Sequence, residues 1–103
     1  TELIFRSLHN TARVASNVVS REVVEILAGG GQFSDVKDLV AGVRGRKVFD
    51  DGDIDAGIWT VGTVMGLIDD IPTCAELISR IVGEAEELIT GRLGAMVTSA
   101  VSA

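Results

Sequence analysis

The segment "GIWTVGTVMGLIDDIPT", positions 57–73, decides the predicted fold, because it holds the only Trp, the only Pro and a Gly-x-x-x-Gly pair. It carries no charge before Asp69. The apolar run at positions 56–68 is shorter than the roughly 18 to 20 residues that a membrane-spanning helix needs. The segment therefore predicts a buried helix over 56–68, with Asp53 or Asp55 as its N-cap.

Four residues of this predicted helix, Trp59, Gly62, Thr63 and Gly66, recur at i, i+3, i+4 and i+7 and so share one face. A face made mostly of small residues lets a second backbone or a flat ligand come close, because little projects from it. Each Gly costs a helix about 1 kcal/mol relative to Ala, and such a close approach would offset that cost. Helix packing alone is the simpler interpretation, and the residues by themselves favour it over a ligand site.

The C-terminal part of the chain predicts one long amphipathic helix over 72–92. Pro72 stands where this helix begins, a position at which its missing N–H costs little. Glu76, Arg80, Glu84 and Glu87 fall on the polar face. The apolar face consists of Cys74, Leu77, Ile78, Ile81, Val82, Ala85, Leu88 and Ile89. We expect this face to dock on another surface, whereas the tail 98–103 has neither bulk nor pattern and is predicted to be disordered.

The part before position 57 predicts a hairpin followed by helices. Positions 2–8 and 11–15 pair across a turn at His9 and Asn10, and a helix over 20–28 is ended by the glycines at 29–31. A second helix begins with Ser34 as N-cap and runs to Val43, where the glycines at 42 and 45 fray it. A short helical turn at 46–51 ends at Gly52. The predicted fold is mainly α with a short N-terminal β-hairpin, in one helical domain over 1–97.

Size, charge and cysteine content limit the class of protein. The 103 residues match one small domain, and the apolar share of 47% suggests that a partner covers part of its surface. The net charge of −6 argues against a nucleic-acid partner, since phosphate binding needs clustered Lys and Arg. The lone Cys74 excludes an internal disulfide and indicates a reducing, cytoplasmic setting. Its predicted state is a small buried side chain rather than a reactive thiol.

The sequence contains no complete catalytic or metal-binding set. Aspartates at 51, 53 and 55 match the first ligands of a calcium loop, but Ala56 and Gly62 stand where that loop needs Gly and Glu. The glycines at 29–31 follow a helix and have no adjacent Lys, so they predict a helix stop and not a phosphate loop. The only histidine, His9, belongs to no recognisable dyad and is predicted to be an exposed turn residue.

Two stretches resemble one known family. "NTARVASN" at 10–17 and "VRGRKVFDDGDIDAGIWTVGTVMGLIDDIPTCAELISRIVGEAEELI" at 43–89, with the helices between them, are similar to the C-terminal region of the nitronate monooxygenases, formerly called 2-nitropropane dioxygenases. The most specific part is "GD-x-D-x-G-x-W-x-x-G-x-x-x-G-L-I-x-D-I-P" at 52–72. The resemblance covers nearly the whole chain. His9 stands where this family often has Arg, so no role passes to it.

The resemblance implies a fold and a set of partners. Members of this family are flavin mononucleotide (FMN) enzymes built on a TIM barrel, so the chain would be about the last third of a longer protein. It would form the helical domain that binds substrate and caps the barrel mouth, with a C-terminal helix that returns to the barrel. Its expected partners are the upstream barrel of its own parent chain and a small-molecule substrate, and neither nucleic acid nor a membrane.

The resemblance also implies where the chemistry lies. The loops that hold the FMN phosphate and the catalytic histidine belong to the upstream barrel, so this chain has no catalytic residue and no assigned cofactor-binding residue. The chain alone is expected to be inactive, to bind neither flavin nor metal, and to self-associate through apolar surface. Trp59, Gly62, Thr63 and Gly66 would line the substrate side through shape and apolar contact.

Three functions stay open at this point. The resemblance favours oxidation of nitroalkanes and nitronates by a flavin enzyme. A flavin-dependent NADH:quinone reductase of the same family is the close competitor, because the residues that separate the two lie mostly upstream. A free-standing acidic helical module that binds a partner helix is the alternative from a different class.

Overall fold

The computed structural model describes the backbone of residues 1–101 and the side chains of residues 1–97. Within it the chain is mainly helical with one two-stranded antiparallel sheet, as predicted. Contacts divide the chain into two units, Thr1–Ile68 and Asp69–Ala103, and each is described by itself. A single capping domain over 1–97 stays a prediction. The tail 98–103 lies outside the residues that are described in full, so its disorder also stays a prediction.

The first unit begins with the predicted hairpin. Strand β1 (Glu2–Ile4) pairs with β2 (Ala12–Val14) in antiparallel register, with Ile4 opposite Ala12. Ile4 and Val14 are buried, whereas His9 in the connecting loop is exposed. The hairpin and the exposed turn histidine are therefore confirmed.

Helix α1 (Val18–Ala28) follows the hairpin and contributes three buried apolar side chains to this unit. Val19, Val23 and Leu27 are buried, and their four-residue spacing places them on one helical face. The helix ends at the three glycines, as predicted, with Gly30 in the left-handed region at φ 87°.

The region after α1 differs from the prediction. The single helix expected from Ser34 to Val43 is two helices, α2 (Phe33–Val36) and α3 (Gly42–Asp51). Val36 is fully buried, while Val43 is 77% exposed, so the two valines do not share one packed face. Leu39 and Val40 still pack against the core, and the helix is interrupted at Ala41, whose non-helical backbone (φ −57°, ψ 136°) precedes α3. The predicted end at Gly52 is confirmed, with that residue at φ 69°.

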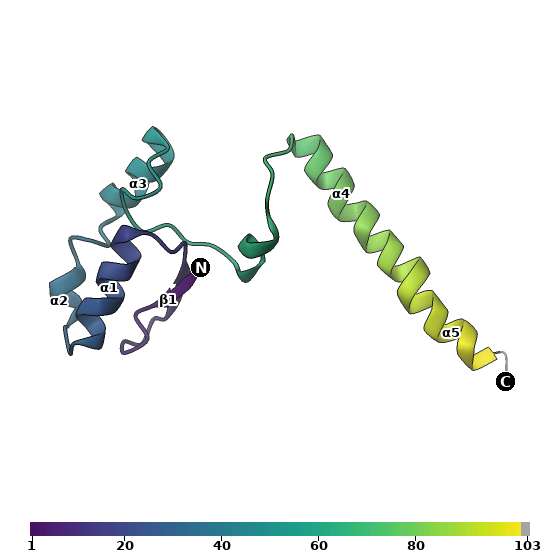
Figure 1. Ribbon diagram of the computed structural model, residues 1–103, viewed down its shortest axis with the longest axis horizontal. Coiled ribbons are helices and arrows are strands. Elements are labelled where there is room, and N and C mark those ends of the chain that lie inside the picture. The colour runs from purple at the N-terminus through teal and green to yellow at the C-terminus, as the bar shows by residue number, and fades with distance from the viewer. Residues whose placement is uncertain (102–103) are drawn as a thin grey trace. The chain divides into compact units, whose positions relative to one another are not determined.

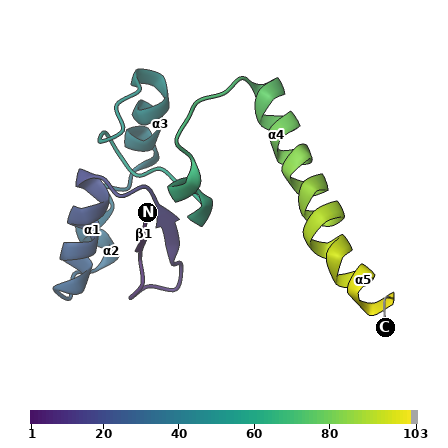
Figure 2. The same cartoon turned by 45° about the vertical axis from the view of Figure 1, so that its right-hand side comes forward.

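One hydrophobic cluster holds the first unit together. Figure 1 and Figure 2 show α2 beside α1 and the hairpin next to them. Five buried side chains form its centre: Ile4, Val14, Val23, Leu27 and Val36. Side chains of β1, β2, α1 and α2 therefore meet in a core that none of these elements could bury alone.

The second unit consists of one long helix. Helix α4 (Cys74–Glu87) continues through the π-helical segment η2 (Leu88–Leu93) into α5 (Gly94–Val101). Thr73 is the N-cap, so Pro72 precedes the helix instead of lying in its first turn. Cys74 was predicted to be buried and is exposed. No helix in the described part of the chain is long and apolar enough to cross a membrane.

Candidate functional site

The helix predicted over 56–68 is not formed. Residues 59–61 are extended and lie along β2: the Ala15 N–H donates to the carbonyl of Trp59 (3.1 Å), and the Val61 N–H donates to the carbonyl of Arg13 (3.2 Å). Thr60 forms a bridge with Val14 between these bonds. Only Thr63–Leu67 is helical, as the 3₁₀ turn η1. The prediction was wrong because the free edge of β2 offers backbone hydrogen bonds to this segment. Thr60 and Val61 are β-branched and favour an extended backbone, and these hydrogen bonds would be lost if the segment were helical.

The extended backbone separates the four residues that were predicted to share a helical face. Trp59 is half-buried, and its indole N–H donates to the carbonyl of Ile54 (3.1 Å). Gly62 caps η1, and Gly62, Thr63 and Gly66 are all exposed. The i, i+3, i+4, i+7 face therefore does not exist, and the three small residues after the tryptophan are each exposed. Their contact with a substrate stays a prediction.

Asn17 attaches the loop before Trp59 to the start of α1. Its amide nitrogen donates to the carbonyl oxygens of Ile54 and Gly57, both at 2.8 Å. Its amide oxygen accepts the N–H of Ser20 (2.8 Å), which caps the helix. Asn17 is 4% exposed and Ser20 is fully buried. One side chain thus satisfies the helix end and two loop carbonyls away from water.

The same network reaches β1. The Ser20 hydroxyl donates to a carboxylate oxygen of Glu2 and accepts the backbone N–H of Asn17 (2.8 Å). No buried side-chain nitrogen or oxygen in the described residues lacks a partner. The hairpin, α1 and the loop at 54–57 are therefore joined by one fully paired polar cluster.

Gly57 lies against the first turn of α3 and is buried. A Cβ at this position would lie 2.5 Å from the carbonyl carbon of Arg44 and 2.7 Å from the backbone nitrogen of Gly45. The Arg44 side chain crosses this contact and donates from Nε to the carbonyl of Ala56 (3.0 Å). Only glycine lets the two backbones come so close.

Sequence reasoning missed both of these positions. Asn17 followed by Ser20 is a helix-start signal, yet the helix was expected to begin near Ser20, because the pattern of apolar residues starts there. The loop carbonyls that Asn17 binds are up to 40 positions away, and nothing local predicts them. Gly57 belongs to the quoted family pattern at 52–72, but nothing local predicts its close contact, because its neighbour Arg44 belongs to another element.

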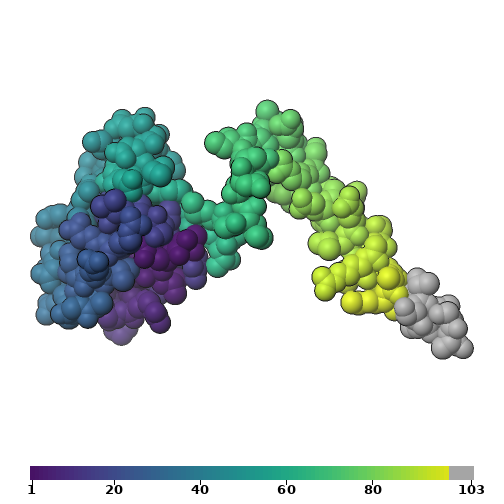
Figure 3. Space-filling model, in the orientation of Figure 1, coloured from purple at the N-terminus to yellow at the C-terminus, as the bar shows by residue number. Residues whose placement is uncertain are grey.

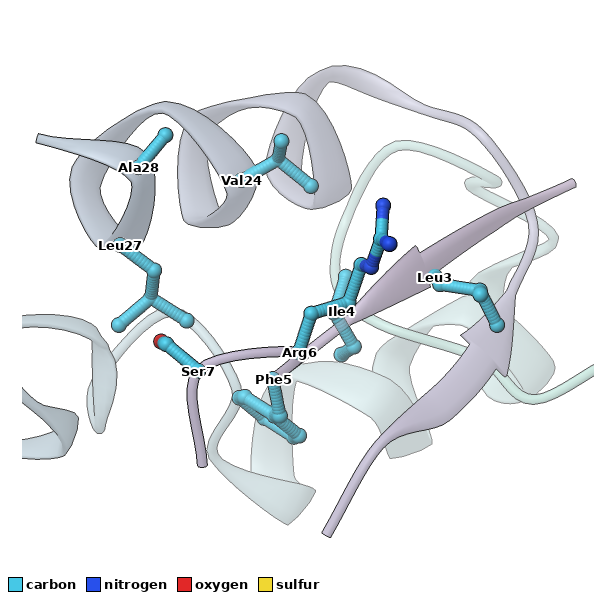
Figure 4. Close-up of a pocket in the computed structure, with 8 residues that line it drawn as sticks. All are labelled: Leu3, Ile4, Phe5, Arg6, Ser7, Val24, Leu27 and Ala28. Atoms are coloured by element: carbon cyan, nitrogen blue, oxygen red, sulfur yellow. The ribbon is translucent and has the colours of Figure 1, made fainter. Parts of the chain in front are cut away.

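A pocket of about 270 Å³ lies between the end of β1 and α1. The sequence did not predict it. Its lining is mostly apolar: Leu3, Ile4, Phe5, Val24, Leu27 and Ala28, with Arg6 and Ser7 as the polar members. Figure 4 shows these side chains, which come from the strand, from the segment after it and from the helix.

Phe5, which lines the pocket, has an unusual backbone conformation. It has φ 61°, a left-handed conformation that costs a residue other than glycine about 1 kcal/mol or more. Its ring meets that of Phe33 edge to face with the centroids 6.3 Å apart, and its carbonyl accepts the Leu8 N–H (2.9 Å). These contacts hold the strained loop in place beside the pocket.

The apolar face of α4 has no cover within the second unit. Ile78 and Ile81 are 62% and 58% exposed, and Leu88 is similarly exposed. Light green and yellow in Figure 3 mark this helix, and among the described residues of the second unit no other element packs against it. The spacing of this face agrees with the prediction. The helix therefore presents an apolar stripe that can be buried only against another protein surface.

A bidentate ion pair leads into α4. Arg80 donates to both carboxylate oxygens of Asp70, at 2.8 and 3.1 Å. These hydrogen bonds hold the pKa of Asp70 below its ordinary value, and the same pair raises the pKa of Arg80. Bonds from the backbone and hydroxyl of Thr73 likewise lower the pKa of Glu76 in the first turn.

Removing the guanidinium should change how Asp70 titrates. We expect Arg80→Gln to raise the pKa of Asp70 toward its ordinary value, because the charge-assisted hydrogen bonds are lost. The depressed pKa means that the pair stabilises the fold above the unfolded pKa and that this contribution disappears as the pH falls through the folded pKa. A carbon-detected NMR titration of the carboxyl group measures the shift. Arg92→Gln is the matched control, and an unchanged Asp70 titration in Arg80→Gln would contradict the expectation.

The glycine loop at 29–31 does not provide a phosphate site. The three amides of the glycine loop are already used, since Gly29, Gly30 and Gly31 donate to carbonyls of Glu25, Leu27 and Ile26. The FMN phosphate therefore does not fit here. No group of three His, Cys, Asp or Glu side chains within the described part of the chain could hold a metal ion.

No family model matches the chain. Membership of the nitronate monooxygenase family therefore stays a prediction from the sequence pattern at 10–17 and 43–89.

Proposed function

We propose that the chain is the substrate-binding portion of an FMN-dependent oxidoreductase of the nitronate monooxygenase type, which oxidises nitroalkanes or nitronates. The observation that carries this proposal joins sequence and structure. Asn17 ends the first stretch that resembles the family, and its amide binds the carbonyls of Ile54 and Gly57 in the second. Two stretches that resemble the family but are far apart in the sequence therefore form one buried contact. This contact supports the interpretation of both stretches as parts of one family pattern.

The role proposed for the chain is to bind and shield the substrate. FMN would be held by the barrel of the parent protein, which supplies the redox chemistry. The exposed surface of Gly62, Thr63 and Gly66 offers close approach, and Trp59 is fixed beside it by its bond to Ile54. Such a surface contributes shape and exclusion of water, without acid or base groups.

The proposal predicts the effect of filling this surface. In the full-length protein we expect Gly62→Leu to lower kcat/KM for a nitronate roughly tenfold, because one added side chain in a binding surface changes binding by that order. A Cβ on Gly62 meets only Val64, at 4.0 Å, so the local fold tolerates it. Steady-state kinetics and the flavin content are the measurements.

Gly42→Leu is the matched control for this experiment, since a Cβ there meets nothing within 4 Å and the position starts α3. The proposed substrate role is contradicted if Gly62→Leu and Gly42→Leu both retain normal kinetics. Equal loss of flavin in both variants would instead indicate a general folding defect, and a second variant, Gly66→Leu, then repeats the test at a position that is also open.

Two alternative functions are also supported by specific features of the chain. A NADH:quinone reductase of the same family would use the same capping surface, and assays of the full-length protein with nitronates and with NADH plus quinone separate the two activities. The uncovered apolar face of α4 would also suit a stand-alone module that binds a partner helix. The sequence encoded before Thr1 discriminates these classes, because an enzyme requires alternating strands and helices there.

A further inference from the structure

We propose that the pocket between β1 and α1 binds a small organic anion with an apolar body, of the class of short-chain carboxylates. This inference is independent of the proposed oxidoreductase function. It rests on the pocket itself, which is separate in sequence from Trp59 and the small residues after it.

The walls of the pocket set the apolar part of the ligand. Ile4, Val24 and Leu27 line it from the strand and from the helix, and Phe5 adds an aromatic wall. A volume of about 270 Å³ is near the lower end of ligand pockets, so it admits a small molecule and not a dinucleotide. Burial of a hydrocarbon chain against these side chains supplies the non-directional part of the affinity.

Arg6 sets the charge of the ligand. It is the only charged residue in the lining, and Figure 4 shows its side chain among the residues that line the pocket. Among the described residues it forms no ion pair or side-chain hydrogen bond, unlike Arg44, Arg46 and Arg80. A guanidinium with five free donors matches a carboxylate in two parallel hydrogen bonds, and the Ser7 hydroxyl lies in the same lining.

The strained backbone at Phe5 also supports a ligand site in this pocket. The left-handed backbone of Phe5 directly precedes Arg6 and Ser7, so the two polar residues follow the one non-glycine position with positive φ in the described chain. Strain of this kind is common where a ligand is held, because it pre-positions the binding groups. The lining of the pocket contains no Asp or Glu, so no carboxylate of the lining competes for the guanidinium.

A titration with paired probes tests the proposal. Hexanoate and its neutral analogue 1-hexanol are titrated into the protein by ligand-observed NMR. We expect saturable binding of hexanoate that is about fivefold tighter than that of hexanol and that weakens with salt, because the guanidinium is exposed. Arg6→Gln should remove this preference, and Ala28→Trp, which fills the mouth from an exposed position, should weaken both probes.

Arg21→Gln is the control, because that side chain is exposed on α1 outside the pocket. Retained hexanoate preference in this variant, together with its loss in Arg6→Gln, supports the proposal. Equal binding of hexanoate and hexanol, no binding of either, or binding that neither Arg6→Gln nor Ala28→Trp changes would overturn it. Arg6→Gln alters only an exposed side chain, so the result does not depend on the larger substitution folding.

Discussion

Replacing Asn17 with Ala is expected to lower the free energy of unfolding of the first unit by about 3 kcal/mol. The loss of the helix cap accounts for about 1 kcal/mol, and the remainder comes from leaving the carbonyls of Ile54 and Gly57 without donors. Urea unfolding followed by circular dichroism measures the total. The fluorescence of Trp59, the only Trp, reports the loop directly, because its indole is bonded to Ile54.

The two parts of this loss can be separated. Asn17→Ser keeps a capping oxygen but cannot reach both loop carbonyls, so it should recover only about 1 kcal/mol. Hydrogen exchange at the amides of Ala15 and Val61 should accelerate in both variants. These two amides form the hydrogen bonds between β2 and the segment 59–61, which follows the loop. Asn10→Ala, in the exposed turn, is the neutral control. Full recovery of stability by Asn17→Ser would show that the loop bonds contribute nothing.

Gly57→Ala is expected to destabilise the same unit by about 3 kcal/mol, although it adds a single methyl group. The new Cβ would lie 2.5 to 2.7 Å from backbone atoms of Arg44 and Gly45, and backbone atoms cannot rotate away. One of the two segments must therefore shift, which is the cost of overpacking. The shift also lengthens the bond from the Arg44 side chain to the Ala56 carbonyl. Thermal or urea unfolding measures the loss.

Gly42→Ala is the matched control for that experiment. A Cβ at position 42 meets nothing within 4 Å, and the residue begins α3 without a positive φ. The substitution should leave stability unchanged or raise it by up to about 1 kcal/mol through helix propensity. If Gly57→Ala behaves like Gly42→Ala, the close approach of the loop to α3 is not as the structure has it.

Local patterns account for the elements that were predicted correctly. The hairpin follows from two short apolar runs around a polar turn, and α1 ends where three glycines remove its side chains. The amphipathic period of α4 and the left-handed Gly52 after α3 depend only on neighbours within a few positions. Each of these signals acts over distances that a short window of sequence contains.

The predictions were wrong where contacts between segments distant in the sequence decide the backbone conformation. Positions 56–68 have a helical spacing of small and apolar residues, but the edge of β2 accepts Trp59 and Val61 as an extended partner. The predicted helix from Ser34 to Val43 is interrupted at Ala41, between the buried Val36 and the exposed Val43. The candidate substrate surface changed with the first of these errors, and the pocket of Arg6 needs the register of β1 against α1 to be known.

The sequence by itself determined the mainly helical class, the hairpin, the C-terminal ends of α1 and α3, and the apolar face of α4. These depend on hydrogen bonds and side-chain spacing between residues that are close along the chain. Only the tertiary structure decided that 59–61 extends along β2, that Asn17 holds the loop at 54–57, and that Gly57 must lack a side chain. The physical reason is that a buried carbonyl or a close backbone contact is satisfied by whichever group the fold brings near, and that group here lies more than ten positions away.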